Sequence, residues 1–286
     1  MATYLSTVAL VAPRRRIMPL PIRNRRFELS GVPRAWHGGR RAVTAFFDGL
    51  SVFFPEGERF FIASVRAHAD RLHEVSDAAL LRDVRGFCGQ EGVHSREHDR
   101  YNAHLADQGY PVKDMERRVT RILRFVSKTS PKRVQLAATC ALEHFTALMG
   151  HFLLEEPRNL EGAHPEMAAL WRWHAAEENE HKSLAFDVYR AAGGNEVERG
   201  AVMAIATVIF WAKVLEHQAR TMKTDGILFD AREWADLVRF LFVEPGSMRG
   251  LVGKYLRYYR PGFHPRDIPS DHLVSSWLES YDRMAA

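Results

Sequence analysis

The chain has 286 residues, of which 46% are hydrophobic and 26% are charged, and this is the composition of a globular protein with ample material for a core. No stretch reaches the roughly 18 apolar residues that a membrane-spanning helix needs. The longest apolar run, residues 201–212, is predicted to be a buried helix because Lys213 follows it at once. Two cysteines exclude a disulfide scaffold and a four-cysteine zinc site, and they favour a reducing compartment, so we expect a cytoplasmic protein.

The net charge of +5 is concentrated at the N-terminus. Residues 1–45 contain nine arginines, no lysine and one acidic residue, Glu28, so this segment carries +8 and the rest of the chain carries −3. A basic arm can contact nucleic acid or anionic lipid, but no zinc-finger spacing, aromatic RNA-binding motif or Gly-rich phosphate loop accompanies it. We therefore expect residues 1–40 to form a solvated or self-docking arm with no nucleic-acid partner. Membrane contact by this arm is left open.

Helical periodicity runs through nearly the whole chain, and strand-like alternation is scarce. Pro55 suits the first turn of a helix, Asp77 can cap a long one, and residues 109–111 (Gly-Tyr-Pro) end it. In chain order the predicted helices cover residues 43–52, 56–72, 77–107, 113–127, 131–154, 165–192, 196–222, 231–242, 246–259 and, after a Pro-rich segment, a last stretch from 271. The sequence therefore predicts an all-α protein.

Four of these helices carry acidic residues where an amphipathic core helix should be apolar. In chain order, with the histidines that follow two of them, these residues are Glu58, Glu91 with His94, Glu143, and Glu178 with His181. The lone glutamate precedes the Glu-x-x-His pair by 33 residues in the first half and by 35 in the second, so the two halves look like copies of one helix-pair unit. Three residues turn a helix by about 300°, so the glutamate and histidine of each pair share one face.

Two such pairs and two single glutamates, pointing into a four-helix bundle, are the ligand set of the di-iron and di-manganese carboxylate proteins. Carboxylates bridge two hard cations, and one imidazole on each leaves positions open for oxygen or substrate. We therefore predict a ferritin-like four-helix bundle over residues 41–195 that holds two metal ions, with iron first and manganese as the alternative. Residues 196–286 are expected to form additional C-terminal helices packed on the bundle. The competing interpretation is a set of surface glutamates with histidines satisfied in the core.

Helix geometry also ranks the neighbours of these residues. His174 lies one turn before Glu178 on the same stripe, so we predict that it is a third imidazole ligand. Glu177 and Glu180 lie about 60° and about 120° away from that stripe and are not expected to bind metal. Glu56 competes with Glu58, which sits further inside its helix.

Four further residues lie near the predicted ligands and are not predicted to be ligands themselves. His98 follows Glu91 by seven residues and is close to it in angle, so its presence near the metals is left open. Glu97 points away from that face, and we expect it to be solvated. Cys88 and Cys140 each precede a predicted ligand by three residues and are expected to be small buried core residues.

The segments that carry these residues resemble a known family. They include Phe-Pro-Glu-Gly-Glu at 54–58, Gln-Glu-Gly-Val-His at 90–94, Ala-Leu-Glu-His at 141–144 and the run from Trp173 to Lys182, with a Tyr-Tyr-Arg-Pro-Gly-Phe-His-Pro tail at 258–265. As a set they resemble the bacterial "predicted metal-dependent hydrolase" family of ferritin-like type, over roughly residues 20–270. The ligand pattern is also similar to that of di-iron N-oxygenases acting on aryl amines, where an additional histidine one turn before the last Glu-x-x-His binds iron. His174 occupies that position.

Three functions are compatible with this pattern. The first is activation of O₂ by two irons to oxidise or oxygenate a small organic substrate, which also needs an electron donor. The second is hydrolysis by a metal-bound hydroxide, which the family description favours. The third is a non-catalytic role in metal binding, or in contact with a membrane or protein partner through the arm and the apolar helix at 201–215, where a homodimer is also left open. We expect the first function.

Overall fold

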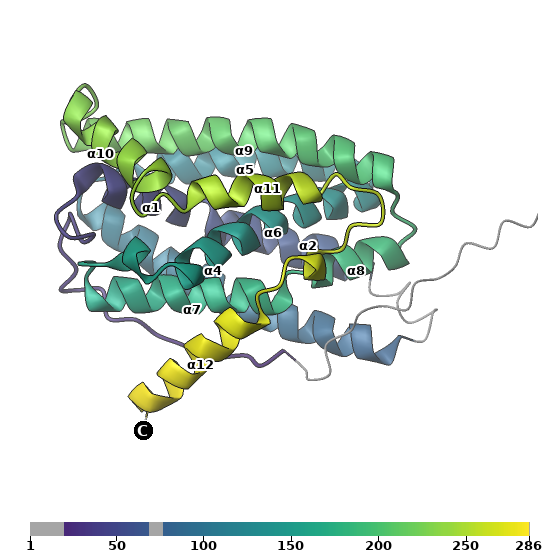
Figure 1. Ribbon diagram of the computed structural model, residues 1–286. Coiled ribbons are helices and arrows are strands. Elements are labelled where there is room, and N and C mark those ends of the chain that lie inside the picture. Colours follow the sequence, from purple (N-terminus) through teal and green to yellow (C-terminus); the bar gives the residue numbers. More distant parts are fainter. Residues whose placement is uncertain (1–19, 69–76, 286) are drawn as a thin grey trace, which may run out of the picture.

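The computed structural model describes residues 20–68 and 77–285, and this part of the chain is helical (Figure 1). The helices are α1 (Arg41–Ser51), α2 (Phe54–Arg66), α4 (Ala78–Asp107), α5 (Val112–Thr129), α6 (Lys132–Glu155), α7 (Pro165–His181), α8 (Leu184–Ala191), α9 (Glu196–Thr224), α10 (Ala231–Phe242), α11 (Met248–Arg257) and α12 (Asp271–Ala285), with short 3-10 turns at Pro157–Leu160 and Pro265–Asp267. Among the described residues, β-type pairing is limited to one isolated bridge between His37 and Ala163. The all-α prediction is confirmed.

Most helix boundaries follow the local signals in the sequence. The side chain of Asp77 caps α4 by accepting a hydrogen bond from the backbone N–H of Leu80, and a proline occupies the first turn of α2. The single helix predicted over 165–192 is wrong, because α7 ends at His181 and α8 begins at Leu184. Between them, Lys182 donates to the carbonyl oxygen of Ile268 and to the hydroxyl of Ser270. These partners are distant in sequence, so helical periodicity does not reveal them.

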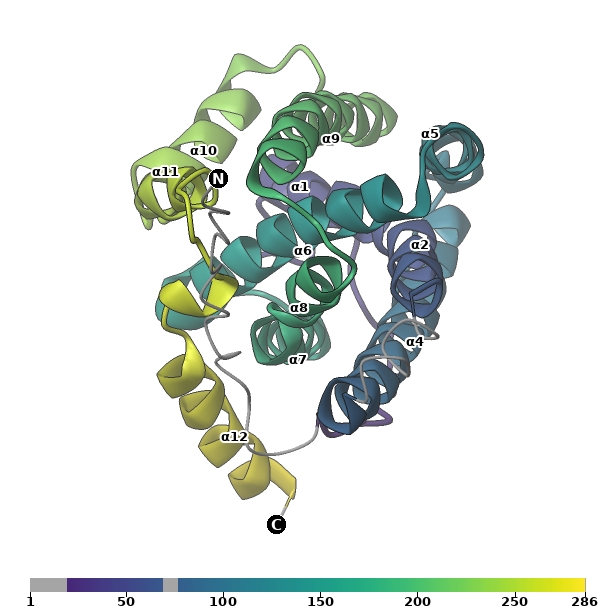
Figure 2. The same ribbon diagram turned by 90° about the vertical axis from the view of Figure 1, so that its right-hand side faces the viewer.

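Two helix pairs form the bundle that positions the site. Helix α2 packs against α4, and α6 packs against α7, while α2 also contacts α6 (Figure 2). The pairing matches the two copies of one helix-pair unit in the sequence. Helices α1 and α9 pack on each other and α9 also covers α6, whereas α10 and α11 lie against α1 and α6 respectively. The C-terminal α12 contacts α6 and α7.

The segment before α1 is packed onto the bundle. Leu20 and Phe27 are buried in this segment, and Leu20 lies so close to α4 that a Cβ at Gly86 would come within 2.6 Å of the Leu20 Cβ. The backbone N–H of Phe27 donates to Glu97, whose carboxylate also accepts from Arg96 and Arg100. The prediction that Glu97 is solvated is therefore wrong, because residues 20–40 cover that face of α4.

The apolar helix of the sequence analysis is α9. By length and composition alone it could cross a membrane, a test that core helices of soluble proteins also pass, and 17% of its most apolar window is buried. One face packs on α1 and α6, whereas Ile205, Val208 and Leu215 are exposed. The prediction that residues 201–212 are buried is therefore wrong, because uniform apolar composition does not indicate which faces have neighbours. A membrane contact or a homodimer through α9 stays a prediction.

Asp48 in α1 is a buried acid whose protonation should influence stability. Its Oδ1 accepts hydrogen bonds from the indole N–H of Trp36, at 2.9 Å, and from the hydroxyl of Tyr101. Burial raises the pKa of Asp48 from 3.8 to about 7. The folded protein therefore keeps a proton that the unfolded chain loses above about pH 4, and the free energy of unfolding falls as pH rises through this interval.

We expect the Asp48→Asn variant to lack this pH dependence, because asparagine keeps the accepting oxygen and carries no charge. Between about pH 5 and about pH 8, its free energy of unfolding should rise relative to the wild type by about 2–3 kcal/mol. Urea unfolding at both pH values measures the difference. The control is Asp236→Asn, which alters a partly exposed carboxylate paired with Arg40. Its free energy of unfolding should show no comparable rise relative to the wild type between the two pH values. An equal effect of both substitutions would contradict the role of Asp48.

Candidate metal centre

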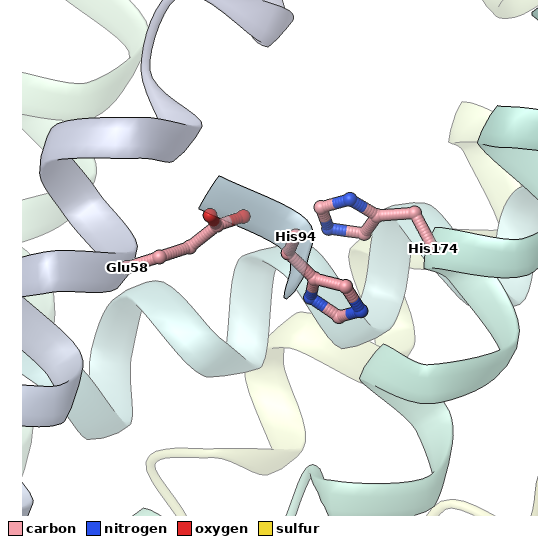
Figure 3. A group of neighbouring side chains, drawn as sticks. All are labelled: Glu58, His94 and His174. Atoms are coloured by element: carbon pink, nitrogen blue, oxygen red, sulfur yellow. The ribbon is translucent and has the colours of Figure 1, made fainter. Parts of the chain in front are cut away.

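The structure brings all seven predicted ligands together inside the bundle. They are Glu58 from α2, Glu91 and His94 from α4, Glu143 from α6, and His174, Glu178 and His181 from α7. None of the seven is more than 3% exposed. Two triplets can be distinguished, and within each of them one donor atom per residue lies within 4.8 Å of the other two. One triplet is Glu58, His94 and His174, shown in Figure 3, and the other is Glu91, Glu178 and His181.

Two of the glutamates lie between the halves of the site. The Oε1 of Glu178 is 3.0 Å from the Nε2 of His174 and 3.5 Å from the Nδ1 of His94, whereas its Oε2 is 3.6 Å from the Nε2 of His181. Glu91 likewise places Oε1 3.1 Å from the Nε2 of His181 and Oε2 3.9 Å from the Nδ1 of His94. Each of these carboxylates turns one oxygen toward each half, which is the arrangement of bridging ligands.

The other residues divide into two half-sites. The first half-site contains Glu58, His94 and His174. The second contains His181 and Glu143, whose Oε2 is 3.5 Å from the Nε2 of His181. The first half-site therefore has two imidazoles and the second has one. The four helices thus give each half-site one glutamate of its own and one oxygen from each of Glu91 and Glu178.

Most donor atoms of these side chains make no contact with the geometry of a hydrogen bond in the described part of the chain, although the Nε2 atoms of His174 and His181 lie 3.0 and 3.1 Å from carboxylate oxygens. The donor atoms without such a contact are both carboxylate oxygens of Glu58, Glu91 and Glu143, Oε2 of Glu178, Nδ1 of His94, and Nε2 of His174 and His181. Burying charged or polar atoms without partners is costly unless they coordinate a metal. The donor set, rich in carboxylate oxygen with a few imidazole nitrogens, suits iron or manganese. The residues therefore fit two metal ions.

Protonation of these groups reflects the crowding of negative charge. Burial raises the pKa of Glu58, Glu91 and Glu143 above its usual value. Burial also opposes ionisation of Glu178, but the neighbouring histidines, His181 first, outweigh it and lower the pKa of Glu178. The pKa of His181 is raised because its carboxylate neighbours, Glu143 first, outweigh the desolvation that lowers it. A metal ion supplies the positive charge that protons otherwise provide, so metal binding should release protons.

Two imidazoles are oriented by partners outside the site. The Nε2 of His94 donates to Glu177 at 3.0 Å, which directs its Nδ1 toward the carboxylates. The Nδ1 of His181 is 3.0 Å from the Oε1 of Gln90. Because the Nε2 of Gln90 donates to the carbonyl oxygen of Pro21 and to Glu180, its Oε1 must accept from His181. The Nε2 of His181 is thereby directed at the second half-site.

Arg23 connects the two outer partners. Its guanidinium donates to Glu177 at 3.0 Å and to both oxygens of Glu180 at 2.7 and 2.8 Å, and its side chain is 13% exposed. Burial opposes the charge of Arg23, but Glu180 and Glu177 outweigh it and raise its pKa. Neither Arg23 nor Gln90 was identified from the sequence. The sequence of α7 did contain an indication of such partners. Glu177 and Glu180 are acidic residues on a helix that is buried on most sides, and buried acids need donors.

A narrow pocket reaches the first half-site. Its lining includes Phe46, Phe47, Leu50, Phe54, Phe152, Trp171, His174 and Glu178, and the space open to a water-sized sphere is about 30 Å³. This is room for a few water molecules at most. Of the aromatic residues near the predicted ligands in the sequence, Phe54 and Trp171 line this pocket, whereas Phe61, Phe87 and Phe145 do not. Cys88 and Cys140 are buried, as predicted. His98 is buried behind His174 and belongs to neither triplet.

The helical bundle and its buried glutamate–histidine groups define an all-α protein with a candidate metal centre. A family model described as "predicted metal-dependent hydrolase" matches residues 21–268, and the chain belongs to this family. The match includes Arg23 and all seven predicted ligands, and it confirms the family resemblance found in the motifs. No curated protein and no solved structure was found to match the chain. The similarity to di-iron N-oxygenases stays a prediction.

Proposed function

We propose that the chain is a two-metal enzyme in which Glu58, His94 and His174 would hold one ion, Glu143 and His181 would hold the other, and Glu91 and Glu178 would contribute to both. The observation that carries the proposal is the convergence of buried donor atoms without hydrogen-bond partners from four helices. Iron is the first choice and manganese the second, because carboxylate oxygens outnumber imidazole nitrogens. The ferritin-like arrangement of the four helices is part of the same proposal.

We take hydrolysis as the first activity, because the family description supports it more than the oxygen activation expected from the sequence. When bound, two such ions polarise a substrate carbonyl and lower the pKa of a water molecule. Among the described residues that line the pocket there is no lysine or arginine to hold a phosphate or a carboxylate. Phe54 and Trp171 would instead exclude bulk water and contact apolar groups. The substrate class that fits is a small uncharged ester or amide.

Oxidation of a small organic substrate by O₂ is the second candidate. Two observations favour it: the pocket is small and mostly aromatic, and His174 matches the additional histidine of the N-oxygenase pattern. An electron donor would then be required. A site of this kind would exclude water from the reaction and admit O₂ readily.

The two activities are separated by their need for oxygen. The chain is freed of metal with a chelator and loaded anaerobically with two equivalents of Fe(II) or Mn(II). We expect metal-dependent hydrolysis of small uncharged esters at the same rate with and without O₂. Optical changes and O₂ uptake on admitting air, without ester turnover, would establish the second candidate instead. Two bound metals with neither activity would favour a non-catalytic role, and no bound metal would contradict the proposed centre.

A further inference from the structure

A row of hydrogen-bonding side chains leads from His174 away from the candidate metal centre. The Nδ1 of His174 is 2.8 Å from the Nε2 of His98, and the Nδ1 of His98 is 2.9 Å from the hydroxyl of Ser51. This hydroxyl lies 2.8 Å from the Oδ1 of Asn102, whose Nδ2 is 3.1 Å from Glu116 on α5. The three middle members are at most 2% exposed. The row therefore connects the first half-site to a partly exposed carboxylate.

The outer end of the row has only one arrangement of donors and acceptors. An ionised carboxylate and a backbone carbonyl oxygen only accept hydrogen bonds. One terminal atom of the Asn102 amide lies 3.1 Å from Glu116 and 3.4 Å from the carbonyl oxygen of Ser51. This atom must therefore be the nitrogen of the NH₂ group, and the Oδ1 of Asn102 must accept a hydrogen bond from the hydroxyl of Ser51.

The donor and acceptor roles at Asn102 determine the roles in each hydrogen bond that lies closer to the metal centre. The hydroxyl of Ser51 has one proton and gives it to Asn102, so it accepts from the Nδ1–H of His98. A neutral imidazole with a proton on Nδ1 has a lone pair on Nε2, so His98 accepts from the Nδ1–H of His174. The Nε2 of His174 is then left with its lone pair facing the first half-site, where the Oε1 of Glu178 lies 3.0 Å away without the geometry of a hydrogen bond and would be the acceptor if Nε2 carried the proton instead.

We propose that Ser51, His98 and Asn102 are positioning residues that hold His174 in the tautomer able to bind a metal ion. The proposal rests on the proposed function for the role of His174 as a ligand. The row orients His174 and does not conduct protons, because the amide of Asn102 neither takes up nor releases a proton at neutral pH. It completes a pattern in which every imidazole of the site has its outer nitrogen fixed, as Glu177 does for His94 and Gln90 for His181.

Packing keeps the two rings of this row in place. The ring of Phe54 lies 4.6 Å from that of His98 and 4.4 Å from that of His174, measured between centroids. Trp171 contacts the edge of the His98 ring, at 5.6 Å. Rotating either imidazole by half a turn to exchange its nitrogens would displace these neighbours. The tautomers therefore depend on the hydrogen bonds, and removal of the Ser51 hydroxyl should release them.

The tautomers are measured directly in metal-free protein by nitrogen-15 NMR of labelled histidine side chains near neutral pH. In the wild type we expect both His98 and His174 to carry the proton on Nδ1. In Ser51→Ala, His98 loses its acceptor and can move its proton to Nε2, which leaves His174 protonated on Nε2. Ser51→Thr keeps the hydroxyl and should restore the wild-type spectrum. A wild-type His174 protonated on Nε2, or a Ser51→Ala spectrum without change at either histidine, would overturn the proposal.

Titration with Co(II) gives the second readout on the same proteins. We expect two equivalents to bind the wild type and Ser51→Thr, and one of the two sites to weaken about tenfold or more in Ser51→Ala. Ser64→Ala is the matched control, because it removes another buried hydroxyl, which pairs with Thr139 outside this row. Equal weakening in Ser64→Ala would mean a general packing effect and would contradict the proposal. If the wild type binds no Co(II), the proposed metal centre fails, while the NMR tautomers still decide whether the row orients His174.

Discussion

Replacing Glu178 or Glu91 with alanine is expected to abolish the binding of both metal ions. Each carboxylate turns one oxygen toward each half-site, so its loss removes a ligand from both ions at once. It also removes the negative charge that holds two cations close together. Metal analysis after equilibrium dialysis against Mn(II) should show less than one equivalent per chain in either variant, against two in the wild type.

The controls for this result come from α2. Glu58→Ala should lose the ion of the first half-site while the second half-site keeps its own ligands. Glu56→Ala should retain two equivalents, because Glu56 is partly exposed and paired with Arg59. Two equivalents retained by Glu178→Ala, or metal loss in Glu56→Ala, would show that the helix faces have been misassigned.

The Arg23→Ala variant is expected to be strongly destabilised. Arg23 donates to the side chains of both Glu177 and Glu180, which are almost wholly buried, so its removal takes from two carboxylates the guanidinium charge that they share. Breaking a buried ion pair by removing one partner costs about 3–5 kcal/mol. Urea unfolding of metal-free protein should show a decrease of this size in the free energy of unfolding. Metal affinity should decrease as well, because Glu177 and Gln90 would no longer be held against His94 and His181.

Two further variants identify the cause of that loss. Arg41→Ala breaks a more exposed ion pair with Glu233 and should cost less than about 1 kcal/mol. Adding Glu180→Gln to Arg23→Ala should recover part of the stability, because it removes one of the two buried carboxylate charges that Arg23 neutralises. A loss in Arg23→Ala no larger than in Arg41→Ala would mean that the segment before α1 contributes little to the fold.

The residues of the site could be predicted from the sequence because helices have a fixed rotation per residue. A Glu-x-x-His pair shares one face of any helix, so its spacing determines orientation before the fold is known. The same rule placed His174 on the stripe of Glu178, and the structure brings it to the first half-site. The two-fold repetition of the pattern then indicated which helices pair, and α2 with α4 and α6 with α7 follow it.

The features that escaped prediction depend on contacts between distant segments. Glu97 is buried because residues 20–40 lie over α4, and this segment has no helical periodicity to indicate where it packs. Arg23 is one of nine arginines near the N-terminus, and nothing local distinguishes it from the others. The exposed face of α9 was missed for a related reason. Hydrophobic composition shows that a helix can be buried, but it does not show which of its faces have neighbours.

The close approach of Leu20 to Gly86 gives the back of α4 an influence on metal retention. A methyl group at position 86 would meet the Cβ and the backbone oxygen of Leu20, so the segment before α1 would have to lift. Arg23 follows three residues after Leu20 and would move with it. In directed evolution of this protein, substitutions at position 86 should therefore change metal content from a distance, and glycine there should be selected together with an intact Arg23.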